Sequence, residues 1–592
     1  MTNIKKLFSL LSKNEKKRAF FLLIMILISA ILDTIGVASI MPLIALLSNS
    51  SLVETNMLIN KVYNFFRFDD PQVFLFYMGV SFFLFFLSTM VFKALTIYLQ
   101  LRFSLMCEYS VGKRLLQSYL FQPYTWFLDR HGSDLTKNIL SAVNQAINQG
   151  LLPIFNFIAQ GLVAFFIIIL LVFVDPKLSL IVGLTLGIIY GVTYKLFSNM
   201  LNRIGLERVQ SDKERYTAIS NAFGAIKETK LGRLENFYTR VFSDPAKRFA
   251  NNQATAQIIG QLPRYIFEAI AFGGLLLIIL YLMRKSEDFT STLPILSLYV
   301  LAGYRLMPAL QQLYRSLASL RYAEPVIKSL SSDLKKKPDI NILKDKLDFK
   351  KYISLRNITF SYPKSSKNNL NNISIKIPAK STIGLVGSTG SGKTTLVDLV
   401  LGLLEPREGT LEIDNTIINR NNLASWQSII GYVPQQIFLS DQSISSNIAF
   451  GVDSKLVDHE AVEHASKIAN LHNFVTNECK ESYNTLIGER GIRLSGGQRQ
   501  RIGIARALYH KPKVLILDEA TNALDSLTEQ AVMDAVYNLS NKITIILIAH
   551  RLRTVKNCDQ VFLMDKGNII ASGNYDELSK SNKDFNQFIS LE

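Results

Sequence analysis

Cysteine is scarce in this chain of 592 residues, which contains only Cys107, Cys479 and Cys558 and no CxxC pair. Such wide spacing excludes a disulfide framework and a cysteine-based metal site, and it suits a chain that faces a reducing cytosol. Charged residues are also few, at 19% of the chain against 48% hydrophobic residues. This balance excludes a purely soluble protein and directs attention to long apolar runs.

Acidic residues are outnumbered by basic ones, which gives a formal net charge of +18. Lysine and arginine gather at 5–18, before the first apolar run, and again at 201–255. Because cytoplasmic loops of membrane proteins carry excess lysine and arginine, this pattern predicts a cytoplasmic N-terminus. No RNA-binding motif or aromatic-interleaved basic patch accompanies the charge, so nucleic acid is not an expected partner.

Six apolar stretches approach the length of about 20 residues that crosses a bilayer. They cover about 19–47, 72–100, 151–174, 178–199, 258–283 and 292–312. The first is interrupted by Asp33, Gly36 and Pro42, exceeds the core of a signal peptide and lacks a clear cleavage site, so we expect it to remain in the membrane. An even number of spans predicts that both termini are cytoplasmic.

Two connections between these spans are long, at about 50 residues between the second and third and nearly 60 between the fourth and fifth. They contain many helix formers and few breakers, which favours spans that continue into the cytoplasm and return. The turns are expected near 122–134 and 224–233. Two small cytoplasmic helical inserts are the alternative interpretation.

The first outside loop, 48–72, is longer than the other two. Its apolar residues predict a short amphipathic helix, which either lies on the outer membrane surface or caps the helical bundle. These residues are Leu52, Leu58, Val62, Phe65 and Phe66.

The charged segment 331–350, which contains Pro338, is interpreted as a linker. It separates a transmembrane domain at 1–330 from a domain at 351–592 that resembles an ordinary soluble α/β domain. The expected fold class is therefore a membrane α-helical domain with six spans joined to an α/β P-loop ATPase domain.

A complete GxxxxGK[ST] motif lies between an expected strand and an expected helix. Its backbone N–H groups close around phosphate, Lys393 neutralises the β- and γ-phosphates, and the Thr394 hydroxyl is placed to hold Mg²⁺. The expected nucleotide-binding residues here are Gly387, Ser388, Thr389, Gly390, Ser391, Gly392, Lys393, Thr394 and Thr395. Alone, such a motif also occurs in kinases and GTPases.

Further motifs remove that ambiguity. The buried-strand pattern "KVLILDEAT" ends in Asp518, expected in the Mg²⁺ shell, and Glu519, expected to polarise the attacking water. The segment "LSGGQ" places Ser495, Gly496, Gly497 and Gln498 at the start of a helix, another phosphate-seeking N-terminus. "LIAHR" adds His550 at a strand end, and we expect Glu519, His550 and Lys393 to be catalytic.

The order and spacing of these motifs resemble the nucleotide-binding domain of ABC transporters over about 350–592. The resemblance implies ATP and Mg²⁺ as cofactors, with Tyr362 stacking on adenine and Gln435 sensing Mg²⁺. It also implies that 522–525 is the D-loop, with Asn522 where serine is more usual, and that 486–491 touches the coupling helices.

One ATPase domain and one membrane half resemble an ABC exporter half-transporter, whose membrane domain sends two excursions into the cytoplasm. In that family two nucleotide-binding domains pair head to tail. The signature serine of one copy then meets the phosphate held by the other, so the resemblance implies a homodimer with two competent ATP sites.

Cations in or near the spans raise the question of what is moved, because a guanidinium in hydrocarbon costs at least about 2.5 kcal/mol. Arg264 lies four residues before Glu268, so the two are able to pair on one helix face. Arg305 has no carboxylate within its own helix turn, which leaves open a substrate-cavity role, snorkelling or pairing with another helix. The expected cavity residues are Lys93, Arg102, Arg264 and Arg305.

The first span, the segments "PRYIFEAI" and "AGYRLMPAL", and the extended outer loop resemble PglK-type lipid-linked oligosaccharide flippases. The resemblance implies movement of a polyprenyl-pyrophosphate glycan across the bacterial inner membrane. A general lipid, multidrug or peptide exporter is the alternative, although only about 18 residues precede the first span, which argues against an N-terminal peptidase domain. A non-transport ABC ATPase shares the motifs but needs no membrane spans.

Overall fold

The computed structural model describes residues 2–48, 57–66, 68, 70–285, 289–334, 347–363, 365, 367–520, 526–549 and 551–590. The chain divides into two compact units. The first contains Met1–Gln122 and Arg130–Pro338, and the second contains Pro123–Asp129 and Asp339–Glu592.

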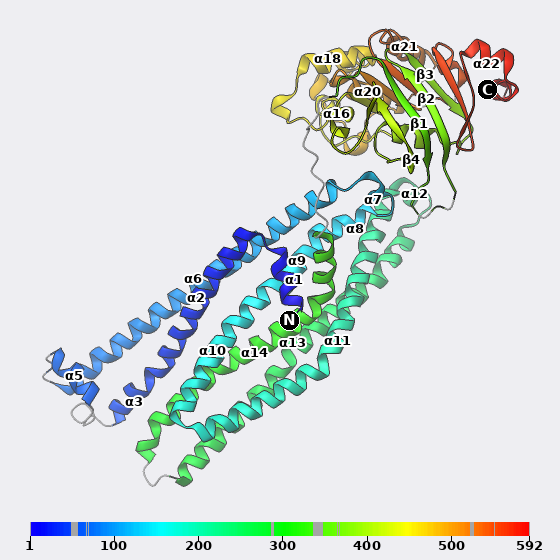
Figure 1. Cartoon of the computed structure of the whole chain (residues 1–592). Helices are drawn as coiled ribbons and strands as arrows, with labels where there is room; N and C mark the ends of the chain where they lie inside the picture. Colours follow the sequence, from blue (N-terminus) through cyan, green and yellow to red (C-terminus); the bar gives the residue numbers. More distant parts are fainter. Residues whose placement is uncertain are drawn as a thin grey trace. The chain divides into compact units, whose positions relative to one another are not determined.

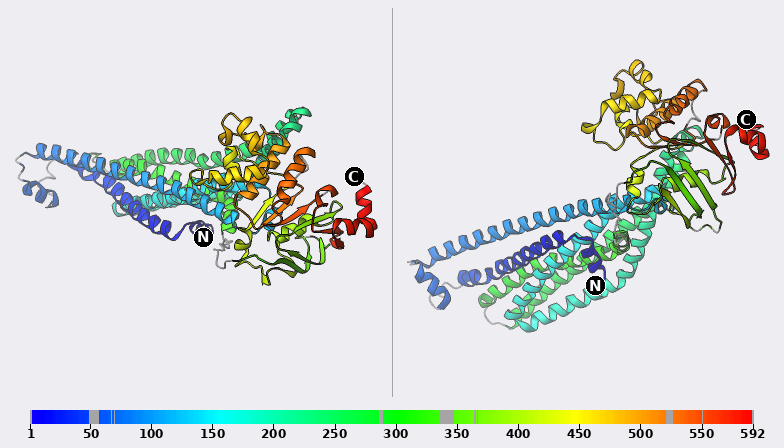
Figure 2. Two further views of the ribbon diagram at one scale, coloured as in Figure 1. Left: turned by 90° about the horizontal axis from the view of Figure 1, so that it is seen from above. Right: turned by 45° about the horizontal axis from the view of Figure 1, so that its top comes forward.

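The first unit is a bundle of long helices (Figure 1), in which α10 packs on α14, α11 on α13, and α2 on α6. The two views of Figure 2 show α2 running beside α6 along its length. The helices are α1 (Thr2–Leu10), α2 (Lys13–Ala38), α3 (Ile40–Ser48), α5 (Met57–Phe65), α6 (Pro71–Leu120), α8 (Gly132–Lys137), η1 (Asn138–Ala142), α9 (Val143–Ala146), η2 (Ile147–Leu151), α10 (Leu152–Val174), α11 (Pro176–Gly224), α12 (Ile226–Leu231), α13 (Glu235–Lys285) and α14 (Phe289–Leu334).

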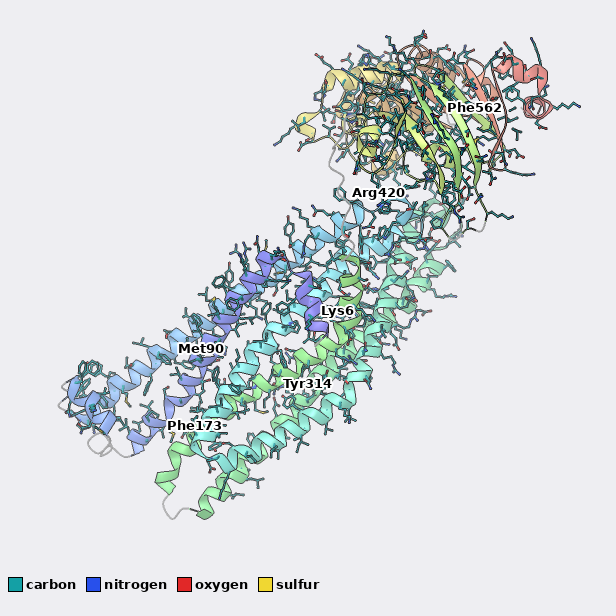
Figure 3. The ribbon with its side chains drawn as sticks, in the orientation of Figure 1. Lys6, Met90, Phe173, Tyr314, Arg420 and Phe562 are labelled. Atoms are coloured by element: carbon teal, nitrogen blue, oxygen red, sulfur yellow. The ribbon has the colours of Figure 1, made fainter. Side chains whose placement is uncertain are left out.

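Three segments of the described chain are long and apolar enough to cross a membrane: Lys13–Leu47, Pro71–Leu120 and Gly132–Val174. They contain the first three predicted spans. The other three predicted spans fall on α11, α13 and α14 and stay predictions. Apolar side chains cover the outside of this unit, where Phe173 is 84% exposed, whereas Tyr314, at 2%, lies between helices (Figure 3).

The first predicted span is broken into α2 and α3 at Ser39. Pro42 follows directly and has no N–H group for the carbonyl one turn earlier, so it cannot continue a regular helix. The residues that interrupt the apolar run therefore have different consequences, because Pro42 lies near the break whereas Asp33 remains inside α2.

The long connections are continuations of the helices rather than inserted subdomains. α6 has 50 residues, α11 has 49 and α13 has 51, so each extends well beyond the length that crosses a bilayer. The first excursion turns through α7 (Tyr124–Leu128), which is part of the second unit, and the second turns through α12.

The outer loop contains a helix, as predicted, at α5. One side of the helix packs through Ile59 and Tyr63 near buried Leu46 and Phe74. On its other side, Val62 and Phe65 are exposed. The helix thus caps the ends of α3 and α6 and also presents an apolar face, while Leu52 lies outside the described residues.

The helix α14 continues to Leu334, so the first four residues of the predicted linker 331–350 are helical. The segment "SSDL" contains no helix breaker, and Pro338 comes only afterwards. Residues 335–346 lie outside the described chain, and 347–350 have no regular structure.

The second unit is a layered α/β structure with two sheets. The larger sheet has the strand order β10-β9-β3-β8-β7-β6 and the smaller has the order β2-β1-β4-β5. The strands are β1 (Tyr352–Phe360), β2 (Leu370–Pro378), β3 (Thr382–Gly387), β4 (Glu408–Ile413), β5 (Thr416–Ile417), β6 (Ile430–Val433), β7 (Val514–Asp518), β8 (Thr544–Ile548), β9 (Gln560–Asp565) and β10 (Asn568–Gly573).

Helices cover both faces of the larger sheet, whose central strands are parallel. The helices of the second unit, besides α7, are α15 (Lys393–Val400), α16 (Leu423–Gln427), α17 (Ile444–Ile448), α18 (His459–Ile468), α19 (His472–Asn477), α20 (Gly496–Tyr509), α21 (Ser526–Tyr537), α22 (Tyr575–Ser581) and α23 (Lys583–Ser590), with short 3₁₀ turns at Ser454–Leu456, Ser482–Asn484, Glu489–Gly491 and Leu552–Val555.

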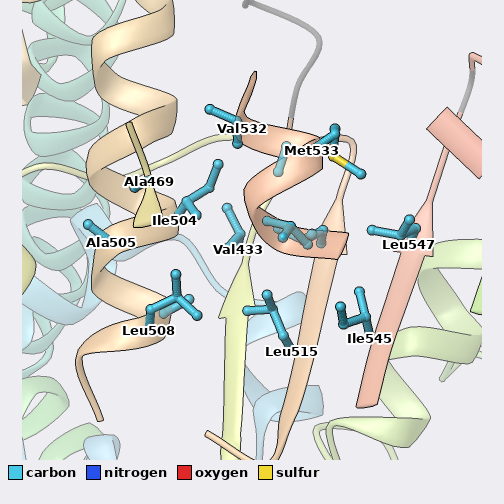
Figure 4. Close-up of a cluster of buried hydrophobic side chains, with 14 of the residues drawn as sticks. Val433, Ala469, Ile504, Ala505, Leu508, Leu515, Val532, Met533, Ile545 and Leu547 are labelled. Carbon is cyan, nitrogen blue, oxygen red and sulfur yellow. The ribbon is translucent and has the colours of Figure 1, made fainter. Parts of the chain in front are cut away.

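One apolar core lies between α20, α21 and the sheet (Figure 4), where Ile504, Leu515 and Val532 are fully buried. All five residues of β7 and all five of β8 are buried. Because both faces of such strands are covered, their sequences are nearly continuous apolar runs rather than alternating ones. This core fixes the carboxyl ends of β3 and β7, from which the polar residues of the candidate site follow.

Close packing of α11 on α14 depends on Gly205. A Cβ atom at this position would lie 2.5 Å from the backbone oxygen of Tyr322, so alanine requires the helices to separate. We expect Gly205→Ala to destabilise the first unit by about 1–3 kcal/mol, measured by thermal unfolding of the purified chain. Gly191→Ala is the matched control, because no atom lies within 4 Å of its Cβ. Equal melting temperatures for Gly205→Ala and wild type would contradict the packing argument.

Candidate nucleotide site and charged cluster

The phosphate-binding loop is held between a buried strand and a helix. All six residues of β3 are buried, and α15 begins at Lys393. A Cβ atom on Gly387 would lie 2.1 Å from the Met564 oxygen, and Gly392 has a φ of +104°, so both positions require glycine. Ser388, Thr389, Gly390 and Ser391 complete the loop between them, and Thr394 and Thr395 follow on α15.

The Lys393 side chain is 5% exposed and bends back over its own loop. Its ammonium donates to the backbone oxygen of Gly387 at 2.8 Å and to that of Ser388 at 3.0 Å. Burial lowers the pKa of Lys393, and the carboxylates of Glu519 and Asp518 oppose that shift. The loop therefore holds a buried cation where backbone N–H groups and a helix N-terminus favour an anion.

Two carboxylates follow the buried strand β7. Asp518 is 5% exposed and accepts a hydrogen bond of 3.4 Å from the Tyr432 hydroxyl. Glu519 has a φ of +50°, and its backbone N–H donates to the Ile548 oxygen. The Gln435 amide donates to the Glu519 carboxylate at 2.7 Å. The structure thus brings Lys393, Asp518, Glu519 and Gln435 to one edge of the sheet.

Tyr362 lies beside the helix that begins at the phosphate loop. Its hydroxyl is 3.2 Å from the Thr395 hydroxyl, and its ring meets that of Phe360 edge to face at 5.1 Å. An aromatic ring in this position offers a surface on which a base is able to stack.

The signature segment forms the capped start of α20. The Ser495 hydroxyl accepts from the Gln498 N–H at 3.2 Å, and the Gln498 side chain accepts from the Ser495 N–H at 2.8 Å. Gly496 and Gly497 are the first two residues of the helix. Across the described part of the chain, no hydrogen bond or ion pair joins Ser495–Gln498 to the phosphate loop, so one copy does not bring these two motifs together.

Two predicted features cannot be placed. His550 and the predicted D-loop residues 522–525 lie outside the described residues. The segment 486–491 is described and contains Arg490 in a left-handed conformation, with a φ of +52°.

A further carboxylate beside the site was not predicted. Asp398 on α15 is 9% exposed, and burial, followed by the neighbouring Asp518, raises its pKa to about 6. Burial, then Asp518, then Asp398 raise the pKa of Tyr432, and burial followed by Asp398 raises the pKa of Tyr124. The available signal was an aspartate inside the otherwise apolar helix "TTLVDLVLG".

The first unit contains a second cluster, centred on a buried carboxylate. Asp33 on α2 is 5% exposed, and its carboxylate lies 2.5 Å from the Lys93 ammonium of α6 and 3.8 Å from the Arg305 guanidinium of α14. The Arg305 guanidinium also lies 5.6 Å from the centre of the Phe86 ring. Arg305 is therefore paired with a residue of another helix, which is one of the interpretations left open above.

The remaining predicted cavity cations lie elsewhere. Arg264 pairs with Glu268 at 2.6 Å, as the spacing predicts, and both side chains are about half exposed. Arg102 is exposed and donates to the Tyr98 hydroxyl on its own helix at 3.1 Å. Neither residue contacts the Asp33 carboxylate among the interactions of the described residues, so the four predicted cations do not form one cluster in a single copy.

Known proteins resemble the chain over different lengths. Residues 370–522 match the family described as "ABC transporter". A putative export ATP-binding/permease protein of Rickettsia typhi is 41% identical over 39% of this chain, and an ATP-dependent lipid A-core flippase of Cupriavidus pinatubonensis is 29% identical over 79%. The matches span 40% of the Rickettsia protein and 80% of the Cupriavidus protein.

A solved structure described as a bacterial Atm1-family ABC exporter with ATP bound resembles the whole chain. The TM-score is 0.82 at 20% identity, over 97% of this chain and 98% of that one. The predicted fold class is therefore confirmed: the chain has the ABC exporter fold, and its second unit contains an ABC transporter ATPase domain.

We expect Asp398→Asn to raise the melting temperature more at pH 7.5 than at pH 5. The folded pKa of about 6 exceeds the unfolded value, so stability falls as pH rises from about 4 to about 6 and is then constant. The uncharged amide avoids this loss, which at neutral pH is on the order of 2 kcal/mol. Thermal unfolding of both proteins at the two pH values measures the difference.

Asp441→Asn serves as the control, because Asp441 is exposed and outside the site. An Asp398→Asn gain that is equal at pH 5 and pH 7.5 would show that the charge of Asp398 is not its cause.

Proposed function

We propose that this chain, with its ABC exporter fold and ABC transporter ATPase domain, works as a homodimeric ATP-driven flippase. The cargo is a lipid-linked oligosaccharide, carried on a polyprenyl pyrophosphate across the bacterial inner membrane. The observation that carries the choice of cargo is the Asp33 cluster, where two cations face one buried carboxylate inside the helical unit.

ATP hydrolysis is assigned to the edge of the larger sheet. The Lys393 ammonium leaves the carbonyl oxygens of its loop and binds the nucleotide phosphates. Glu519 leaves its hydrogen bond with Gln435, then orients and deprotonates the attacking water. Thr394, Gln435 and Asp518 supply the oxygen ligands that Mg²⁺ prefers, and the acidic, buried setting of Asp518 fits a cation. Bound Mg²⁺ would neutralise charge on the phosphates.

The signature segment supports a dimer. Ser495–Gln498 present the N-terminus of a 14-residue helix, and among the described residues no hydrogen bond or ion pair joins them to the phosphate loop of the same copy. A second copy, arranged head to tail, provides the phosphate that this helix start favours. Closing the two nucleotide sites then moves the helical units through the excursions that end in α7 and α12.

The charged cluster supports an anionic cargo. Lys93 and Arg305 leave an excess of one positive charge around Asp33, in a region where apolar helices are expected to cross the membrane. An unbalanced charge there is costly, and a pyrophosphate group would offset it. A purely apolar cargo gives no reason to keep these cations.

A general lipid exporter is the second candidate, favoured by the long match to a lipid A-core flippase. Multidrug and toxin export proteins match over shorter parts of the chain. A non-transport ABC ATPase is disfavoured because the exporter fold extends over nearly the whole chain.

We expect Glu519→Gln to bind ATP and to lose about 10²- to 10⁴-fold in ATPase rate, because the amide accepts from Gln435 but cannot take a proton. Steady-state hydrolysis and the nucleotide retained through gel filtration measure both effects. Glu405→Gln, on an exposed side chain paired with Arg420, is the control. A normal rate in Glu519→Gln would exclude Glu519 as the base.

We expect Arg305→Ala to lower the movement of a pyrophosphate-linked glycan several-fold for each ATP hydrolysed, because the excess cation is lost. The measurement is leaflet transfer in reconstituted vesicles, with hydrolysis recorded in the same preparation. Arg203→Ala removes an exposed arginine outside the cluster and is the matched control. Unchanged transfer in Arg305→Ala would remove this residue from the cargo path.

A further inference from the structure

A cavity of about 250 Å³ lies next to the charged cluster, between α2, α6, α10 and α14. Asp33 and Lys93 form part of its wall. The other polar residues of the wall are Ser29, Thr96, Gln100, Asn156, Gln160 and Gln312. Side-chain amides thus dominate the polar lining, and they come from three different helices.

Placing amide groups in this part of the bundle costs free energy. Thr96 and Gln100 are 4% and 5% exposed, and Gln100, Asn156 and Gln160 lie within predicted membrane spans. Polar groups in such a region are costly unless they are hydrogen-bonded. Several of them around one cavity are therefore better explained by a ligand than by the stability of the bundle.

Packing between helices accounts for only part of the lining. The Gln100 amide donates to the Asn156 side chain at 2.6 Å, which joins α6 to α10 as interhelical amides often do. Within the described part of the chain, the one hydrogen bond of the Gln312 side chain is a long one of 3.5 Å that it accepts from Arg315. Gln160 has no hydrogen-bond partner within the described residues, so the helix-joining role does not explain it.

The chemistry of the lining selects a class of ligand. Each amide has two N–H donors and one acceptor oxygen, which match the alternating donors and acceptors of sugar hydroxyls and N-acetyl groups. Phosphate has only acceptors and is suited to Lys93 and Arg305 instead. An apolar chain would leave every amide unsatisfied. The cavity and the adjoining cluster thus provide neighbouring sites for a carbohydrate and for an anion.

We propose that this cavity is a carbohydrate-binding site, in which Gln160 and Gln312, beside the Gln100–Asn156 pair, bind the sugar attached to the lipid phosphate. The proposal rests on the proposed function and names the part of the cargo that each group of residues recognises. The predicted topology, with a cytoplasmic N-terminus, puts Gln100, Asn156 and Gln312 near the cytoplasmic ends of their spans, on the side where a flippase must capture its cargo. Its volume accommodates a single sugar unit more readily than a whole glycan.

The test uses the full-length protein in nanodiscs and equilibrium binding of three radiolabelled lipids: undecaprenyl diphosphate, undecaprenyl diphosphate carrying N-acetylglucosamine, and a monoglucosyl diacylglycerol. The variants are Gln160→Met and Gln312→Met, which keep side-chain volume and remove hydrogen bonding. Gln311→Met is the matched control, because Gln311 neighbours Gln312 on α14 and is not part of the cavity wall. Thermal unfolding establishes that each variant is folded.

We expect Gln160→Met and Gln312→Met each to weaken binding of the two sugar-bearing lipids about five- to tenfold, the effect of roughly one hydrogen bond. Binding of bare undecaprenyl diphosphate stays unchanged, as does every affinity of Gln311→Met. Equal weakening for bare and sugar-bearing diphosphates, or no weakening at all, would overturn the carbohydrate site. If Gln160→Met fails to fold, Gln312→Met carries the same comparison.

The lipids also separate this proposal from the proposed function. Wild-type protein that binds the glucosyl lipid through Gln160 but neither diphosphate retains the carbohydrate site and loses the pyrophosphate cargo. Wild-type protein that binds both diphosphates alike, with no contribution from the sugar or from Gln160, retains the pyrophosphate cargo and loses the carbohydrate site. Binding of none of the three lipids overturns both.

Discussion

A charge removed from water needs a partner, and this constraint governs both the charged cluster of the helical unit and the phosphate loop of the ATPase domain. In the helical unit the buried carboxylate of Asp33 lies against Lys93 and Arg305. In the ATPase domain the buried ammonium of Lys393 lies against the carbonyl oxygens of its own loop. In both arrangements a cation lies against protein oxygens, which belong to a carboxylate in the helical unit and to backbone carbonyl groups in the ATPase domain. Each of these buried charges is thus paired within the protein.

The rest of the ATPase domain positions these groups. The buried strands β3 and β7 lie on either side of β8, so their carboxyl ends place Lys393 and the pair Asp518 and Glu519 at one edge. The Gln435 amide donates a hydrogen bond to the carboxylate of Glu519, the residue that we propose as the base. In the hydrolysis mechanism that we propose, this hydrogen bond is exchanged before Glu519 acts on water.

In the helical unit, apolar side chains cover much of the outside, and several polar groups lie between the helices. The close approach of α11 and α14 at Gly205 shows how tightly these helices pack, while the Gln100–Asn156 pair joins α6 to α10. Around the amide-lined cavity, however, Gln160 lacks such a partner among the described residues. Such an amide is suited to a ligand that has its own hydrogen-bond donors and acceptors.

The sequence by itself determined what depends on near neighbours along the chain. The phosphate loop, the capped helix start at Ser495, the apolar strand before Asp518 and the Arg264–Glu268 pair follow from spacings of a few residues, and each lies where the spacing predicts. The long helices and their turns follow from apolar runs and the lack of breakers between them. Tertiary structure alone decided which side chains meet across helices. Asp33 was visible only as an interruption of an apolar run, and Asp398 only as an odd residue in an apolar helix. Their partners lie far along the sequence, and which partner each meets depends on how the packed helices and strands are rotated, which local spacing does not specify.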